Sequence, residues 1–122
     1  MIFKREEFTA HSGRTLPWKL DADGLEQGDL RTLAWIAVQH LPKFGTVEGV
    51  PRGGLSLAAL LRAYTTQGAG LLIVDDVMTT GGSLEEHRDG RKAMGLVIFN
   101  RSGVKLSWVH SMFTFSLPQG FE

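Results

Sequence analysis

Residues 71–83 read Leu-Leu-Ile-Val-Asp-Asp-Val-Met-Thr-Thr-Gly-Gly-Ser, and this stretch decides the fold. The apolar run 71–74 is too short for a helix and predicts a buried strand, of the kind found in a parallel sheet covered on both faces. Two adjacent carboxylates, Asp75 and Asp76, are expected to end the strand. A turn of small hydroxyl and glycine residues follows, and the polar run from Ser83 predicts the start of a helix.

A glycine-rich turn between a strand and a helix predicts an anion site. Gly81 and Gly82 allow the backbone N–H groups to turn toward a ligand, because no Cβ is in the way. The helix start adds unpaired N–H groups and a favourable dipole. Thr79, Thr80 and Ser83 add hydroxyl donors. Each hydrogen bond to a charged oxygen contributes about 1.5–3 kcal/mol, so a phosphate monoester can be held here without a lysine.

The two carboxylates narrow the class of phosphate compound. Asp75 and Asp76 would repel a polyphosphate tail, whereas they accept hydrogen bonds from vicinal hydroxyls, so a sugar 5-phosphate fits both halves of the motif. The nucleotide-triphosphate loop requires a lysine where Gly82 stands, and the dinucleotide fingerprint G-x-G-x-x-G is absent. The remaining alternative is an ordinary strand-to-helix turn, which the length of the pattern disfavours.

A second strand–loop–helix unit precedes the first. Residues 46–50 predict a short strand, residues 51–54 a Pro-Arg-Gly-Gly loop, and residues 55–64 a helix with one buried face. In a doubly wound sheet the loops at the carboxyl ends of the strands line one shared crevice. Arg52 would present five donors to anionic oxygens there. Taken alone, this loop would be read as a tight turn, and its pairing with the acidic motif makes it a candidate site.

Other segments predict packing rather than chemistry. Residues 30–41 carry a single apolar stripe and predict a helix that begins at the N-cap Asp29 and ends before Pro42. His87, on the short charged helix after Ser83, is expected to be solvated. Residues 95–100 predict a strand, and residues 99–101 either flank the ligand or form an ordinary strand end. Residues 106–115 predict an edge strand with a hood or a dimer contact.

Composition excludes several functional classes. The chain has 122 residues, 13 basic and 13 acidic side chains and no cysteine. One domain, residues 1–122, is expected, without disulfides or thiolate zinc sites. The balanced charge argues against nucleic acid and membrane surfaces as partners. No segment has the length of a membrane span or the apolar run of a signal peptide, so a cytoplasmic protein is expected.

The motif after residue 74 resembles the 5-phosphoribosyl 1-pyrophosphate (PRPP) signature of type I phosphoribosyltransferases, most closely that of the orotate-type branch. The resemblance implies an α/β fold, a reduced doubly wound (Rossmann-like) parallel sheet with a small N-terminal flap or hood. It also implies that the ribose hydroxyls meet the two carboxylates and that the 5-phosphate lies in the turn. The PRPP-binding residues so implied are Asp75, Asp76, Val77, Met78, Thr79, Thr80, Gly81, Gly82 and Ser83.

The same resemblance assigns the earlier loop to pyrophosphate, through Pro51, Arg52, Gly53 and Gly54. A cis non-proline peptide bond is common in this loop of the family, and it would fall here between Pro51 and Arg52. The implied catalytic residues are Arg52, Asp75 and Asp76. The implied cofactor is Mg²⁺, reached by the two carboxylates through water.

Residues 8–20 predict two short strands of a hairpin or flap, and they resemble the amino-terminal substrate segment of orotate-type enzymes. The resemblance places base-binding residues at Ser12, Gly13, Arg14 and Lys19; the alternative is that both cations are solvated on a surface flap. In the purine-salvage branch an Asp usually stands where Thr79 stands here. A pyrimidine or orotate-like base is therefore favoured over a 6-oxopurine.

Only six residues separate Tyr64 from Leu71, where the family inserts strands and a long flexible loop with catalytic Lys or His residues. The leading hypothesis is a phosphoribosyltransferase with PRPP and a base as substrates, and a lid that another element or subunit supplies. Family members often form homodimers. The alternative from another class is a non-catalytic PRPP- or nucleotide-binding regulatory module, and a nucleic-acid binder that reuses the fold is weaker.

Overall fold

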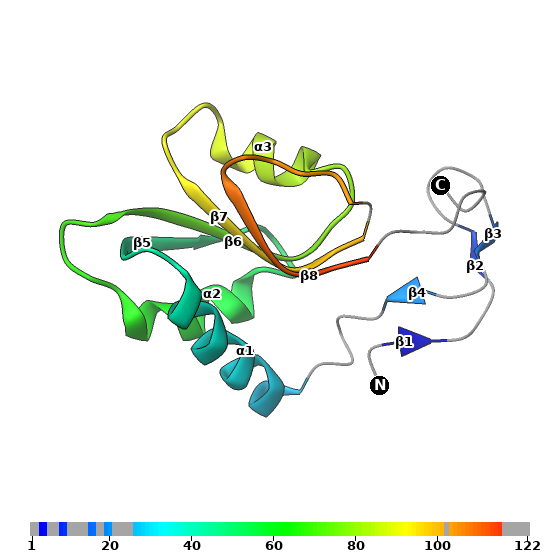
Figure 1. Cartoon of the computed structure of the whole chain (residues 1–122), viewed down its shortest axis with the longest axis horizontal. Coiled ribbons are helices and arrows are strands. Elements are labelled where there is room, and N and C mark those ends of the chain that lie inside the picture. Colours follow the sequence, from blue (N-terminus) through cyan, green and yellow to red (C-terminus); the bar gives the residue numbers. More distant parts are fainter. Residues whose placement is uncertain are drawn as a thin grey trace.

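The structure is a computed structural model of the whole chain. It describes residues 26–101 and 103–115 in full, and before them the backbone of four two-residue strands (Figure 1). All statements about contacts below refer to these residues.

A four-stranded parallel sheet forms the centre of the molecule. Its strands are β5 (Phe44–Gly49), β6 (Gly70–Met78), β7 (Met94–Asn100) and β8 (Val109–Thr114), in the order β5-β6-β7-β8. The two central strands, β6 and β7, carry the long apolar runs that burial on both faces requires. The predicted parallel sheet is confirmed, and residues 109–114 form its edge strand as expected.

The expected end of the central strand was wrong. β6 continues through the acidic pair to Met78, because Asp75 lies opposite Val97 in the ladder with β7 and Met78 lies opposite Asn100. Backbone pairing to a neighbouring strand outweighs the low strand propensity of two aspartates. Both carboxylates therefore project from a strand rather than from a loop.

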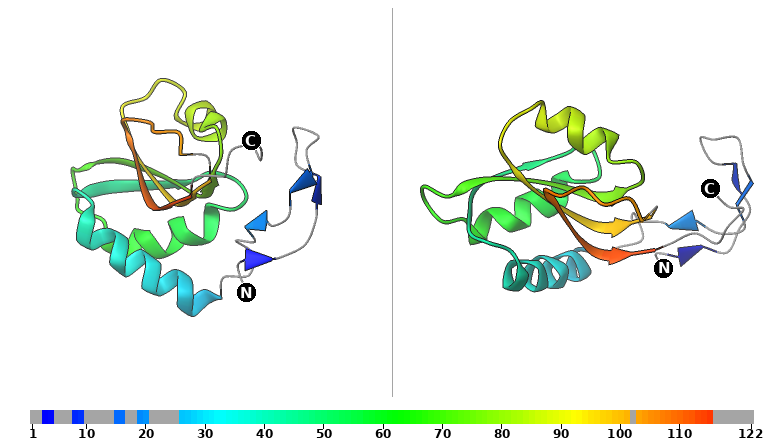
Figure 2. Two further views of the ribbon diagram at one scale, coloured as in Figure 1. Left: turned by 45° about the vertical axis from the view of Figure 1, so that its right-hand side comes forward. Right: turned by 45° about the horizontal axis from the view of Figure 1, so that its top comes forward.

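Helices cover both faces of the sheet, as a doubly wound fold requires (Figures 1 and 2). α1 (Gln27–His40) and α2 (Leu55–Leu61) pack on one face, where Ala34, Ala37 and Leu57 meet β6 and β7. α3 (Gly82–Arg88) packs on the other face through Leu84. The helix predicted over residues 55–64 is shorter than expected, since Arg62–Tyr64 form a 3-10 helix.

The start of α1 also differs from the prediction. The N-cap is Glu26, and Asp29 occupies the third helical position, from which its side chain accepts a hydrogen bond from the Glu26 backbone N–H (3.1 Å). This reciprocal arrangement is a capping box in which Glu26 takes the place of the usual Ser or Thr. Asp29 therefore takes part in capping from the third position of the helix, whereas the sequence pattern predicts it at the N-cap.

The chain crosses from β5 to β6 and from β6 to β7 in the same direction along the sheet, yet α2 and α3 lie on opposite faces (Figure 2). The two crossovers therefore have opposite hands. Parallel crossovers are right-handed in about 98% of cases, so one of the two departs from a strong rule.

The outer edge of β5 is covered by the connection that leads from α2 to β6. The Arg62 guanidinium donates to the Val47 carbonyl (3.1 Å), and the Thr66 N–H donates to the Phe44 carbonyl (2.7 Å). A Cβ on Gly45 would overlap the backbone of Ala69, so the connection lies directly against the strand. Its closeness confirms that the described chain inserts no lid between Tyr64 and Gly70.

The N-terminal flap consists of two antiparallel ladders. β1 (Phe3–Lys4) pairs with β4 (Lys19–Leu20), and β2 (Phe8–Thr9) pairs with β3 (Thr15–Leu16). The predicted flap is thus present, with four short strands where two were expected. In both views of Figure 2 these strands lie off the end of the sheet at which β8 ends. In the part of the chain that the structure describes, no helix combines the length and apolarity needed to cross a membrane.

Candidate functional site

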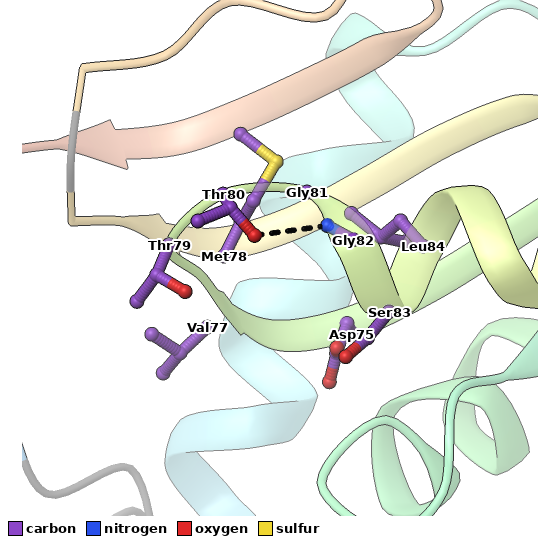
Figure 3. A pocket seen from close by; sticks show the side chains of 9 residues that line it. All are labelled: Asp75, Val77, Met78, Thr79, Thr80, Gly81, Gly82, Ser83 and Leu84. Carbon is purple, nitrogen blue, oxygen red and sulfur yellow. Dashed lines mark hydrogen bonds between the residues drawn. The ribbon is translucent and has the colours of Figure 1, made fainter. Parts of the chain in front are cut away.

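A small pocket lies where β6 passes into α3 (Figure 3). Its volume of about 50 Å³ suits a group the size of phosphate. Gly81 adopts φ 86°, and a Cβ there would lie 2.5 Å from Leu106 Cδ1, so the turn requires glycine. The Thr80 hydroxyl accepts a hydrogen bond from the Gly82 N–H (3.2 Å) and stabilises the turn. The lining residues are Asp75, Val77, Met78, Thr79, Thr80, Gly81, Gly82, Ser83 and Leu84.

Asp75 and Asp76 are adjacent in sequence and belong to different parts of the site. Successive side chains of a strand point to opposite faces. Asp75 accordingly lines the pocket, whereas the Asp76 carboxylate lies against Gly53 of the earlier loop. Each also accepts a hydrogen bond from the next backbone N–H, at 2.8 Å from Asp76 and 2.7 Å from Val77.

Asp75 is poised between its two protonation states. Its side chain is almost completely buried, at 8% exposure. Burial, reinforced by the neighbouring Asp76 carboxyl, raises the pKa of Asp75 to about 7. Near neutral pH this carboxyl can therefore either accept a hydrogen bond from a ligand hydroxyl or donate one.

The loop that follows β5 rests on the acidic strand. Its Pro51–Arg52 peptide bond is cis, at the position that the sequence predicted. A Cβ on Gly53 would overlap the Asp76 carboxylate, and one on Gly54 would overlap the Val74 carbonyl, so both glycines permit the close approach. The Arg52 side chain is exposed and makes no hydrogen bond to a residue that the structure describes. The guanidinium is therefore available to a ligand.

The structure thus brings most predicted site residues together. Asp75 and residues 77–83 share one pocket, and Asp76 joins it to the loop 51–54. Ser12, Gly13 and Arg14 lie outside the described residues, and of Lys19 only the backbone in β4 is described. Among the described residues, no group of three or more His, Cys, Asp or Glu side chains could hold a metal ion.

The sequence left open whether residues 99–101 flank a ligand or form an ordinary strand end, and the structure places the three residues differently. Phe99 is buried and stacks on Phe113 (ring centroids 5.7 Å apart), so it belongs to the core. Asn100, 2% exposed, donates to the Val104 carbonyl (2.6 Å) and holds the following loop. The Arg101 N–H donates to the Met78 carbonyl (2.9 Å), which places this residue beside the pocket, and burial lowers the pKa of its guanidinium.

Polar contacts on both flanks of α3 were not predicted. His87 was expected to be solvated, but its side chain is only 25% exposed and its Nε2 lies 2.9 Å from Glu48 Oε1. On the other flank the Trp108 indole N–H donates to Glu85 (2.6 Å), and Arg88 lies over the Trp108 ring (4.5 Å to its centroid). Glu48 and His87 are 39 residues apart, so no local sequence pattern signals their contact.

Comparison with known proteins gives the fold. No protein-family model matches the sequence, and no curated protein does. Among solved structures, orotate phosphoribosyltransferase from Aeropyrum pernix superposes with a TM-score of 0.71 and 23% identity, over 93% of this chain and 88% of that chain. The orotate phosphoribosyltransferase of Francisella tularensis gives 0.63 and 19%, over 93% and 80%. A xanthine-guanine-hypoxanthine phosphoribosyltransferase from Helicobacter pylori gives 0.52 and 18%, over 75% and 82%. The chain therefore has the type I phosphoribosyltransferase fold.

Proposed function

We propose that this protein binds PRPP and transfers its phosphoribosyl group to a nitrogenous base with release of pyrophosphate. The observation that carries the proposal is that β6 contacts both candidate binding elements through adjacent aspartates. The strand that supplies Asp75 to the phosphate-sized pocket also sets Asp76 against the Pro-Arg-Gly-Gly loop. A sugar phosphate with a second anionic group at the other end matches this layout.

In the proposed complex the turn 79–83 holds the 5-phosphate through backbone N–H groups and hydroxyls. Asp75 and Asp76 meet the ribose hydroxyls, and the pKa of Asp75 near 7 lets it adapt to either hydrogen-bond direction. Arg52 and the backbone of Gly53 and Gly54 receive the departing pyrophosphate. The base attacks the anomeric carbon as the bond to pyrophosphate breaks, so the protein mainly orients the reactants and stabilises charge.

Magnesium fits the carboxylate pair chemically. Mg²⁺ prefers hard oxygen ligands and is usually held by one or two carboxylates together with substrate phosphates. When bound, it would neutralise negative charge on the pyrophosphate. Asp75 and Asp76 would reach it through water, and a cation nearby would favour the ionised form of Asp75.

A pyrimidine or orotate-like base is the proposed acceptor. Thr79 stands where the purine-salvage branch usually has Asp, and two orotate-type structures superpose with higher TM-scores than the purine-type one. Ser12, Gly13, Arg14 and Lys19 are proposed to contact the base. A cytoplasmic homodimer, in which the partner subunit supplies a lid, completes the proposal.

A second candidate is a non-catalytic PRPP- or nucleotide-binding regulator. The connection pinned along β5 favours it, because the family's flexible loop normally excludes water and closes over the pyrophosphate. Under this alternative the same pocket binds the same ligand without turnover.

The test is incubation with PRPP, Mg²⁺ and a panel of pyrimidine and purine bases, following pyrophosphate release. A transferase releases pyrophosphate only with an acceptor base, and a regulator binds PRPP in calorimetry without release. The matched control is the double variant Asp75→Asn, Asp76→Asn, which is expected to keep the fold and to lose PRPP binding. Unchanged PRPP affinity in that variant would contradict the ribose assignment.

A further inference from the structure

We propose that Glu48 is a positioning residue that holds the phosphate-binding turn at a fixed place relative to the pyrophosphate loop. This inference rests on the proposed function, because it concerns how the two halves of that site are kept in register. Glu48 lies in β5 and does not line the phosphate-sized pocket.

The Glu48 carboxylate makes three contacts with the α3 end of the molecule. Both of its oxygens accept from the Arg91 guanidinium, at 2.9 and 2.8 Å, and Oε1 also lies 2.9 Å from His87 Nε2. Paired contacts of this kind fix direction as well as distance, because the fork of the guanidinium matches the carboxylate. The two partners hold the pKa of Glu48 at about 2, first through the hydrogen bond from Arg91.

Arg91 also forms hydrogen bonds with the backbone of α3. Its Nε donates to the Arg88 carbonyl (3.0 Å) and one terminal nitrogen donates to the His87 carbonyl (2.9 Å). These are carbonyls of the last turn of α3, which lack partners within a helix. The carboxylate on β5 is thereby joined to the main chain of α3, and not only to its side chains.

α3 needs external contacts because it is short. It has seven residues between a left-handed Gly81 and a left-handed Asp89, and helices of this length do not persist alone in water. Leu84 is its one fully buried side chain. The Glu85–Trp108 contact holds the flank toward β8, and Glu48 holds the flank toward β5.

The Glu48 contact joins β5, which precedes the loop 51–54, directly to α3, which follows the turn 79–83. Two residues after Glu48, Val50 donates its N–H to Val74 of β6 (2.8 Å), and the loop 51–54 begins. At the other end of the contact, α3 follows directly on the turn 79–83. A shift of α3 would move the turn and leave the loop 51–54 in place.

The experiment compares two probes by calorimetry, ribose 5-phosphate for the turn and inorganic pyrophosphate for the loop. In Glu48→Gln the affinity for ribose 5-phosphate is expected to fall roughly tenfold, because small misplacement of a binding group has large effects. Pyrophosphate affinity should stay within about twofold, as expected for a site that the change does not couple to. Glu86→Gln is the matched control: it removes the same charge from an exposed position of α3 that has no ion pair with a described residue.

A second variant separates positioning from general loss of structure. Arg91→Gln should show the same contrast between the probes, and the double variant Glu48→Gln, Arg91→Gln should bind ribose 5-phosphate no more weakly than the single ones, because both act through one ion pair. All titrations are made well below the unfolding midpoint of each variant. Equal losses for the two probes, or none for ribose 5-phosphate, would overturn the role of Glu48. If the unaltered protein binds neither probe, the proposed function itself fails.

Discussion

Two neighbouring aspartates show how one strand can face two different loops. Asp75 faces the phosphate-sized pocket and is almost completely buried, while Asp76 packs against Gly53. The different surroundings follow from the alternation of side chains along β6. A carboxyl group placed by such a strand is more precisely oriented than one on a loop.

Asp75→Asn should therefore stabilise the protein without ligand at alkaline pH. In the folded protein the pKa of Asp75 is raised to about 7, from an ordinary value of 3.8. The unfolded chain therefore gives up this proton more readily, and the folded protein loses stability progressively as pH rises between these two values. At about 1.4 kcal/mol per pKa unit, the variant should gain up to about 4 kcal/mol in unfolding free energy at pH 8, and the gain should disappear below pH 4. Urea unfolding at both pH values measures this; a gain independent of pH would contradict it.

Arg52→Ala should weaken pyrophosphate binding far more than ribose 5-phosphate binding. The guanidinium projects from the loop 51–54 and makes no contact with the turn 79–83. The fold should be unaffected, because the side chain is exposed and has no partner among the described residues. Titration of each ligand by calorimetry provides the comparison, and equal losses for both would remove Arg52 from its proposed role.

At the scale of elements, the turn between β6 and α3 tolerates little change at Gly81. Gly81 combines a left-handed conformation with contact to Leu106, which lies in the connection to β8. The turn is thus fitted to a segment that comes 25 residues later in the sequence.

Gly81→Ala should lower the unfolding free energy by about 1–3 kcal/mol, because alanine is strained at this φ and its Cβ meets Leu106. Gly90→Ala is the matched control: φ is 73° and no atom lies within 4 Å of the added Cβ, so it measures the conformational cost alone. Thermal unfolding of both variants provides the comparison. Equal loss of unfolding free energy in the two variants would show that the Leu106 side chain moves aside without a measurable cost in stability.

The elements could be predicted from sequence where the signal is local. The apolar run of β6 and the apolar stripe of α1 were sufficient to predict a strand and a helix. The cis peptide bond at Pro51–Arg52 was expected only because the loop resembles the family's pyrophosphate loop. The end of β6 was missed because pairing with β7 decides it. His87 was assigned to solvent because its partner, Glu48, approaches only after β5 and α3 have packed on the same sheet. Contacts between distant segments produce no repeating pattern in the sequence from which they could be predicted.

At the scale of the molecule, the sheet has one covered edge. Arg62 and Thr66 occupy the outward carbonyls of β5, so this strand offers a reduced template for pairing with another chain. Strand edges that lack such cover are a common origin of aggregation.

Arg62→Ala should expose the Val47 carbonyl and increase self-association at elevated protein concentration. Arg31→Ala on α1, an exposed site that likewise loses one positive charge, is the control. Light scattering after size-exclusion chromatography, over a concentration series, measures the mass. Identical behaviour of the two variants would mean that Thr66 and the connection protect the edge without Arg62.

The pinned connection also determines where extra sequence could enter this fold. Thr66 is tied to Phe44, and Ala69 donates back to the Thr66 carbonyl (3.1 Å), which leaves Gln67 and Gly68 at the exposed tip of a tight turn. Gly68, at φ 84°, has open space around it. Grafting a mobile segment between these two residues would lengthen the chain without disturbing either anchor.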